Sequence, residues 1–300
     1  MNPSTPLVTV VLATYERPEA LDVVLHALAA QQGEPFEVIV ADDGSGETIV
    51  QVVERWLPRL ALKHVWQPDE GFRKARAYDL AALATDADYL VFLDGDCVPR
   101  QGFIQAVRKG ARLGWFLSTK RIMLSECFSD RVTRAMLPIW RWSALQWLAR
   151  APREVGRPGY LLPVRDRRRA WRPRQRDFAP PSLAYSLVGV ARADFERVNG
   201  YDTRCIHADD GEDQDIAIRL SRSGLRCGWA GPASTVLHLW HPTRSYGTGG
   251  RLPLFRKTMT DDDRMEAVAG LRELAAEVAE CQVSAKRVGA SSSSSDPANR

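Results

Sequence analysis

Asp94 and Asp96 flank Gly95 directly after the apolar run 89–93. The glycine lets the backbone bend, so both carboxylates can face one site beyond the end of a buried strand. Hard divalent cations such as Mn²⁺ and Mg²⁺ prefer oxygen ligands, and they bridge well to a diphosphate. An isolated Asp-Gly-Asp is more often a simple turn, because both residue types suit turns. Its place directly after a strand favours a metal and nucleotide site.

A second acidic pair, Glu212 and Asp213, opens a segment with helical periodicity. Asp213 lies three and seven residues before Ile216 and Leu220, which places it on the apolar stripe of the predicted helix. The helix dipole favours an ionised carboxylate near this end. A first-turn acid often does no more than complement the dipole. The inward direction of Asp213 favours a catalytic base instead.

Two histidines, His238 and His241, occur in and after the strand-like segment 235–239. His238 alternates with Leu237 and Leu239, so it should face away from them. Neutral imidazole is a common ligand for Mn²⁺ beside carboxylates. A purely structural histidine is the alternative, and the acidic motifs upstream favour the metal ligand.

Strands and helices alternate in the part of the chain that would hold these residues. We expect strands at 8–13, 36–41, 62–66 and 89–93, and helices at 17–28, 48–56 and 73–84. This order predicts βαβ units and an α/β fold with a mostly parallel sheet flanked by helices. Ligands bind beyond the carboxyl ends of such strands. Three expected strand ends carry polar clusters: Thr14-Tyr15, Asp42-Asp43 and Asp94/Asp96.

The alternation is expected to break down from about residue 112 to 181. It should resume with a strand at 185–190, helices at 192–198 and 212–223, and a strand at 235–239. A helical pattern covers 261–280, and the low-complexity sequence after about 282 predicts disorder. The tryptophans of the apolar segment 135–148 suit core packing, a membrane interface or a roof over the active site.

The five cysteines are scattered and never in CxxC spacing, which argues against a disulfide framework or a zinc cluster. No signal peptide and no apolar stretch of about 20 residues is seen, so we expect a cytoplasmic protein. About ten arginines occur between Arg150 and Arg176. Such a segment favours an anionic partner, such as acidic lipid on the inner face of the cytoplasmic membrane, unless it is a solvated loop.

Taken together, these motifs resemble the glycosyltransferase family 2 domain with its GT-A fold. Thr14-Tyr15-Glu16-Arg17-Pro18 is similar to the family's Thr-Tyr-Asn-Arg-Pro, 42–45 to its Asp-Asp-Gly-Ser, and 94–96 to its Asp-x-Asp. Residues 199–202, 211–213 and 219–220 resemble the C-terminal half of galactosyl- and N-acetylgalactosaminyl-transferase-like members. The matched motifs span about residues 7 to 241.

The resemblance implies a role for each matched side chain. The nucleotide-binding residues would be Thr14, Tyr15, Arg17, Asp43 or its neighbour Asp42, Arg76 and Asp94. The metal ligands for Mn²⁺ or Mg²⁺ would be Asp96 and His238, with Asp94 and His241 as further candidates. Asp213 would be the catalytic base, with Glu212 beside it.

Two segments depart from the family pattern. Residues 75–79 read Ala-Arg-Ala-Tyr-Asp where the family often has Ala-Arg-Asn-x-Gly. Residues 207–211 replace a tryptophan-glycine stretch of the related transferases. The second change falls where the donor or acceptor sugar is selected, so the identity of the sugar does not carry over.

The implied activity is inverting transfer of a sugar from a nucleotide diphosphate sugar, with a UDP-sugar expected, to a hydroxyl of a glycan or lipid-linked acceptor. Bacterial surface polysaccharide or lipopolysaccharide synthesis is the expected setting, and no nucleic acid partner is expected. We expect one GT-A domain over 1–282: a nucleotide-sugar half (1–111), a basic insertion (112–181), a catalytic half (182–260) and a C-terminal helix (261–282). Residues 283–300 would be a disordered tail.

Two other classes of function are alternatives to a transferase. A sugar-phosphate nucleotidyltransferase would carry a glycine-rich basic loop after its first strand, where this chain has 14–17, Thr-Tyr-Glu-Arg. A non-enzymatic module that binds nucleotide sugars or nucleic acid has no need for an inward Asp213 together with His238. Both are therefore weaker hypotheses than a transferase.

Overall fold

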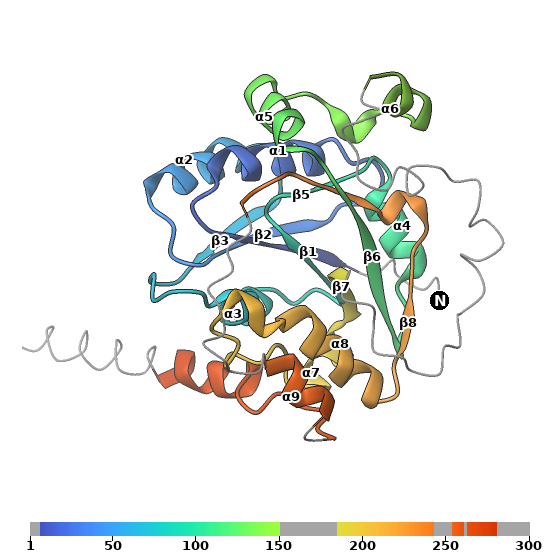
Figure 1. The fold of residues 1–300 in the computed structure, drawn as a ribbon. Helices are drawn as coiled ribbons and strands as arrows, with labels where there is room; N and C mark the ends of the chain where they lie inside the picture. Colours follow the sequence, from blue (N-terminus) through green and yellow to red (C-terminus); the bar gives the residue numbers. More distant parts are fainter. Residues whose placement is uncertain (1–6, 151–184, 243–253, 261–262, 281–300) are drawn as a thin grey trace, which may run out of the picture.

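The computed structural model describes residues 7–150, 185–242, 254–260 and 263–280 (Figure 1). Almost all of the arginine-rich segment and the expected disordered tail lie outside these ranges. In the part of the chain that the structure describes, no helix is both long enough and apolar enough to cross a membrane.

The N-terminal part forms four parallel strands. They are β1 (Val8–Thr14), β2 (Glu37–Asp42), β3 (Leu62–Trp66) and β4 (Tyr89–Asp94). β1, β2 and β4 are almost wholly buried, as expected for continuous apolar strands covered on both faces. The connecting helices are α1 (Pro18–Ala29), α2 (Glu47–Trp56) and α3 (Lys74–Leu83). The strands and helices expected in this region are confirmed to within one or two residues.

Strands that follow β4 along the chain extend the same sheet. They are β5 (Cys97–Pro99), β6 (Trp115–Met123), β7 (Tyr185–Ala191), β8 (Arg226–Gly228) and β9 (Val236–His238). The strand order is β3-β2-β1-β4-β7-β6-β9-β5, with β8 paired to β6. β7 is antiparallel to β4 and β6, whereas β8 and β9 run parallel to β6. The predicted α/β fold with a mostly parallel sheet is confirmed.

Helices cover both faces of the sheet (Figure 1). Val8, Val10 and Leu12 of β1 face a core shared with α1 and α2. Val11 faces the other core, which includes α3 and residues of two further helices, α7 (Arg192–Arg197) and α8 (Glu212–Arg222). Further helical elements among the described residues are α4 (Phe103–Gly110), α5 (Glu126–Ala135), η1 (Ile139–Arg141), α6 (Ala144–Arg150), η4 (Ala208–Asp210), η5 (Pro232–Ser234), α9 (Leu254–Thr260) and a helix over 271–280.

The structure corrects two expectations about the chain after residue 112. The break expected after residue 112 is wrong for β6 and α5, since β6 lies inside the sheet. The helix expected over 261–280 covers only 271–280 of the described residues, and α9 was not predicted. Residues 263–270 instead pack against the turn that comes after α7. Ala267 N donates a hydrogen bond to the Val198 carbonyl of this turn at 3.0 Å.

The tryptophans after α5 pack into the core. Trp142 and Trp147 are buried, with ring centroids 5.0 Å apart, and both rings contact Phe128 of α5. Trp140 is buried against His26 of α1. Core packing, one of the three alternatives for these residues, therefore accounts for their side chains.

A buried charge network fixes α8 to the C-terminal segment. Arg219 is fully buried, pairs with Asp215 at 2.8 Å, and donates to the Val198 and Gly200 carbonyls. Thr258 of α9 donates to Asp215 at 2.6 Å, and Arg264 lies 3.3 Å from the same carboxylate. Buried charges persist only when they are paired and hydrogen-bonded. The network therefore sets the position of the helix that carries Asp213.

Candidate functional site

The three polar clusters expected at strand ends do share one edge of the sheet. Thr14 pairs in register with Asp42, and Ala13 pairs with Asp94. Gly95 N donates to the Ala13 carbonyl at 2.7 Å, and a Cβ at position 95 would lie 2.7 Å from that same oxygen. Only glycine fits this approach without displacement of the backbone. The Asp94-Gly95-Asp96 turn is thus held tightly against the end of β1.

Lys74, at the start of α3, draws three acids together. Its Nζ lies 2.6 Å from Asp94, 2.8 Å from Glu212 and 3.7 Å from Asp213. Arg121 of β6 reaches the other Asp94 oxygen at 3.4 Å. Burial alone would lower the pKa of Lys74, but the three acids hold it well above its ordinary value. The ammonium group therefore stays charged.

The pKa values of the two aspartates in this cluster move in opposite directions. Burial would raise the pKa of Asp94, but Lys74 and Arg121 outweigh it and hold the pKa at about 2. Burial raises the pKa of Asp213 to about 7; Glu212 and Asp94 add to the rise, and Lys74 opposes it. A carboxyl group whose pKa lies near neutral pH is suited to accept a proton and return it.

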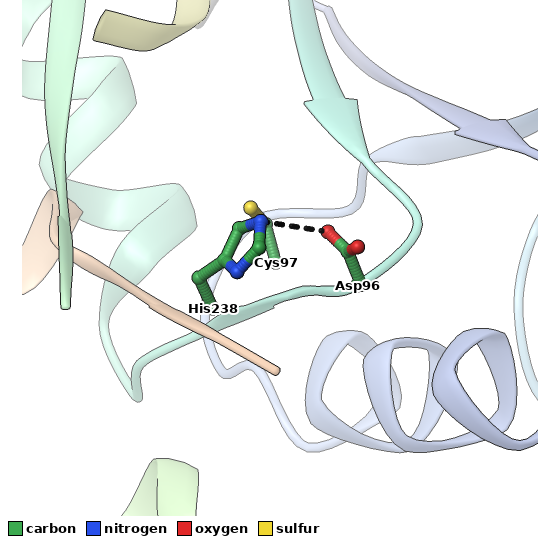
Figure 2. Close-up of side chains that lie close together, drawn as sticks. All are labelled: Asp96, Cys97 and His238. Carbon is green, nitrogen blue, oxygen red and sulfur yellow. Dashed lines mark ion pairs between the residues drawn. The ribbon is translucent and has the colours of Figure 1, made fainter. Parts of the chain in front are cut away.

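Asp96 belongs to a second cluster, on the other side of Gly95. Figure 2 shows Asp96, Cys97 and His238 pointing toward one another, with one ligand atom of each within 4.8 Å of the other two. His238 Nε2 lies 3.5 Å from Asp96 Oδ1, and His241 Nε2 lies 3.4 Å from Asp96 Oδ2. Both expected histidines are therefore next to Asp96.

The chemistry of this second cluster fits a divalent cation. Burial lowers the pKa of His238, although Asp96 opposes this, so the imidazole is neutral and able to ligate. Asp96 Oδ1 is buried without a hydrogen-bond partner in the described part of the chain, and so is His238 Nδ1. Burial raises the pKa of the Cys97 thiol well above its usual range. A carboxylate with neutral imidazole suits Mn²⁺.

The two aspartates expected at the nucleotide, Asp42 and Asp43, differ in their surroundings. Asp42 is fully buried and holds Ser45 N and His64, each at 2.9 Å, which makes its carboxylate part of the scaffold. Asp43 accepts from Gln67 at 2.5 Å and from Arg73 N at 2.8 Å, and burial raises its pKa.

Arg76 and the loop after β1 complete the expected set. Arg76 donates to Gln67 at 2.9 Å and to Glu277 at 2.6 Å. Thr14 is buried and pairs in register with Asp42 at the end of β2, whereas Tyr15 donates to Asp69, which follows β3, at 3.0 Å. Arg17 differs, because its guanidinium pairs with Asp96 at 2.5 Å and lies at the expected metal site.

Sequence reasoning missed three residues of these clusters. Lys74 stands in the basic run 73–76, and nothing in that run separates it from Arg73 and Arg76, because its contact with Glu212 depends on how α3 and α8 pack. Arg121 lies in β6, which was not recognised as a strand. Cys97 directly follows Asp96, but it belongs to none of the motifs that resemble the glycosyltransferase family 2 domain.

Comparison with known proteins gives both sequence and fold similarities. Residues 9–112 match the family model described as glycosyl transferase family 2. Validoxylamine A glucosyltransferase of Streptomyces hygroscopicus subsp. limoneus is 41% identical over 104 residues, which are 34% of this chain and 23% of that protein. Chondroitin synthase of Pasteurella multocida (strain Pm70) is 32% identical over 99 residues, 33% of this chain and 10% of that protein. The match thus spans less than a quarter of the length of these relatives.

The fold has counterparts among solved structures. The mannosyltransferase PcManGT from Pyrobaculum calidifontis, solved with GDP-Man and Mn²⁺, has a TM-score of 0.52 at 21% identity, covering 81% of this chain and 59% of that one. S. aureus TarS has a TM-score of 0.50 at 16% identity, covering 79% of this chain and 37% of that one.

These similarities define the class of the fold and of the N-terminal segment. The α/β sheet is that of GT-A glycosyltransferases. Residues 9–112, which contain Thr14, Asp43, Lys74 and the Asp94–Asp96 turn, have the sequence of a glycosyl transferase family 2 segment. The likeness of the C-terminal half to galactosyl- and N-acetylgalactosaminyl-transferases stays a prediction.

Proposed function

We propose that this chain is an inverting, metal-dependent glycosyltransferase. It would move a sugar from a nucleoside diphosphate donor to an acceptor hydroxyl. The observation that carries the proposal is the position of Asp213: its carboxyl lies beside Lys74 and Asp94, at the strand edge formed by the family 2 segment. Its pKa of about 7 suits a base that works near neutral pH.

In the proposed reaction, Asp213 accepts the proton of the acceptor hydroxyl as its oxygen attacks the anomeric carbon. The bond from that carbon to the diphosphate oxygen breaks in the same displacement, so the anomeric configuration inverts. Lys74 keeps its proton throughout and holds Glu212 and Asp94 beside the base. This contact assigns Glu212 a positioning role.

Asp96, His238 and His241 would hold Mn²⁺ or Mg²⁺. A bound divalent ion neutralises the charge that develops on a departing diphosphate. Asp94 is the weaker candidate ligand, because Lys74 and Arg121 already contact its two oxygens. The same contacts keep Asp94 ionised, with a pKa of about 2, so its carboxylate would suit a hydrogen bond from a nucleotide hydroxyl; Asp43 follows β2, with β1 between them.

A UDP-sugar is the proposed donor and a glycan or lipid-linked hydroxyl the proposed acceptor, in polysaccharide synthesis. Relatives named as chondroitin, hyaluronan and cellulose (UDP-forming) synthases support this setting. The proposed single domain over residues 1–282 is supported by β6, β7 and β9, which join the sheet of β1–β4. The cytoplasmic location and the peripheral membrane contact through Arg150–Arg176 stay predictions.

The proposal is tested with a panel of nucleoside diphosphate sugars in Mn²⁺. Donors that bind are found first by thermal stabilisation, and donor hydrolysis is then measured without acceptor. With an acceptor, NMR of the product reports the configuration at the anomeric carbon. Retention of that configuration, or the absence of stabilisation by every donor, would contradict the proposal.

A further inference from the structure

Arg17 contacts the Asp96 carboxylate more closely than either histidine does. Its Nη1 lies 2.5 Å from Asp96 Oδ2, whereas the histidine contacts are 3.4 and 3.5 Å. Nη2 also donates to the Trp240 carbonyl at 3.2 Å. One guanidinium thus ties the proposed metal ligand to the segment between His238 and His241.

This ion pair opposes the binding of a cation to Asp96. Arg17 already neutralises the carboxylate, and it shares Oδ2 with His241. A divalent ion on Asp96 would add two positive charges beside a guanidinium that cannot lose its proton. The ion must therefore displace Arg17 or gain negative charge from another group.

We propose that Arg17 is an internal competitor of the divalent cation for Asp96, so that the cation binds tightly only together with a nucleoside diphosphate. The diphosphate supplies the negative charge that offsets the guanidinium, and it offers Arg17 a new partner. Arg17 thereby couples nucleotide binding to metal binding. This inference rests on the proposed metal site.

The surroundings of Arg17 leave room for the displaced guanidinium. A cavity of about 340 Å³ opens beside it between α1 and α5. Two acids line this cavity: Glu19, which is exposed, and Asp130, which pairs with Arg134 at 3.8 Å. Arg17 can therefore leave Asp96 without entering apolar surroundings.

The test is the affinity for Mn²⁺, measured by calorimetry or by EPR of the free ion, with and without saturating UDP. Arg17→Gln should bind Mn²⁺ alone about tenfold more tightly than the unaltered protein, as expected for loss of one partly buried charge-assisted hydrogen bond. The gain in Mn²⁺ affinity that UDP provides should shrink in this variant. Because coupling is reciprocal, the effect of Mn²⁺ on UDP affinity should shrink by the same factor.

Two control variants accompany Arg17→Gln. Arg17→Lys keeps the positive charge and should keep most of the competition. Arg55→Gln removes a helical arginine that pairs with Asp22 at 2.8 Å, away from Asp96, and should leave Mn²⁺ affinity unchanged. Thermal unfolding of each variant confirms that it is folded.

Unchanged or weaker Mn²⁺ binding by Arg17→Gln would overturn the inference. Asp96→Asn separates this failure from failure of the proposed metal site. If Asp96→Asn weakens Mn²⁺ binding while Arg17→Gln does not strengthen it, only the competition is wrong. If Asp96→Asn has no effect on Mn²⁺ in the presence of UDP, the metal site and the competition both fall. The measurement is repeated with GDP, which has the same diphosphate and a different nucleobase. An equal gain in Mn²⁺ affinity with GDP and UDP supports coupling through the diphosphate, and a gain with UDP alone contradicts it.

Discussion

Replacing Lys74 by glutamine should move the acid limb of the pH–rate profile upward. The Lys74 ammonium lies 3.7 Å from Asp213 and favours its ionised form. At that separation the attraction is about 1 kcal/mol under water-like screening and about 4 kcal/mol at an effective dielectric constant of about 20. Since about 1.4 kcal/mol corresponds to one pKa unit, the pKa of Asp213 should rise by about 1 to 3 units.

The assay is kcat/KM against pH for transfer or donor hydrolysis at saturating metal. The unaltered protein should lose activity below about pH 7, where Asp213 takes up a proton. In Lys74→Gln the same limb should appear at about pH 8 to 10. Lys74→Arg keeps the charge and should leave the limb near its original position. A limb in Lys74→Gln that stays in place or moves to lower pH would refute the electrostatic link between Lys74 and the base.

Four further predictions concern these clusters and the buried pair of Arg219 with Asp215. Asp213→Asn should lower kcat by about 10² to 10⁴ while leaving donor affinity nearly intact, as kinetics and calorimetry would report; unchanged turnover would exclude Asp213 as the base. The pKa of Asp213 is raised on folding, so the folded state holds this proton more tightly, and stability is lost as pH rises from about 4 to about 7. Urea unfolding of Asp213→Asn should accordingly show a larger gain over the unaltered protein at pH 8 than at pH 5.5, and an equal difference at both would contradict the raised pKa. Gly95→Ala should weaken donor and Mn²⁺ binding together, because its Cβ would press on the Ala13 carbonyl; a variant that binds both normally would show that the turn tolerates displacement. Arg219→Leu should cost about 3–5 kcal/mol of unfolding free energy, since Asp215 loses its buried partner, and a cost below about 1 kcal/mol would mean that Thr258 and Arg264 suffice.

The N-terminal strands could be predicted from sequence because each is a continuous apolar run. β1, β2 and β4 are buried on both faces, so burial leaves a plain signal in composition. β6 gives no such signal, since its middle residues are Ser118, Thr119, Lys120 and Arg121. These polar groups have distant partners: Thr119 donates to the Ser234 carbonyl, and Arg121 reaches Asp94. A single sequence does not reveal such pairings.

In the candidate site, too, some features could be predicted from local sequence and others depend on tertiary contacts. The Asp-Gly-Asp turn and the Glu-Asp helix start could be found from residue type and spacing. Their meeting at Lys74 joins residues 138 positions apart and depends on how α3 and α8 pack. Arg17 was expected at the nucleotide because of its motif, yet it pairs with Asp96, 79 residues away. Local patterns identify the chemical groups, and tertiary packing decides which of them meet.

The buried pair between Asp215 and Arg219 also bears on how short the chain can be made. A version cut after residue 242 would retain every residue assigned to nucleotide, metal and base. It would lack Thr258 and Arg264, and it would leave the Asp215 carboxylate open where α9 now covers it. Asp215 lies two residues beyond Asp213, the proposed base, so the loss would loosen the helix turn that positions Asp213. Engineered truncations or fusions should therefore preserve the sequence through at least Arg264, although no residue assigned to the proposed site lies beyond 242.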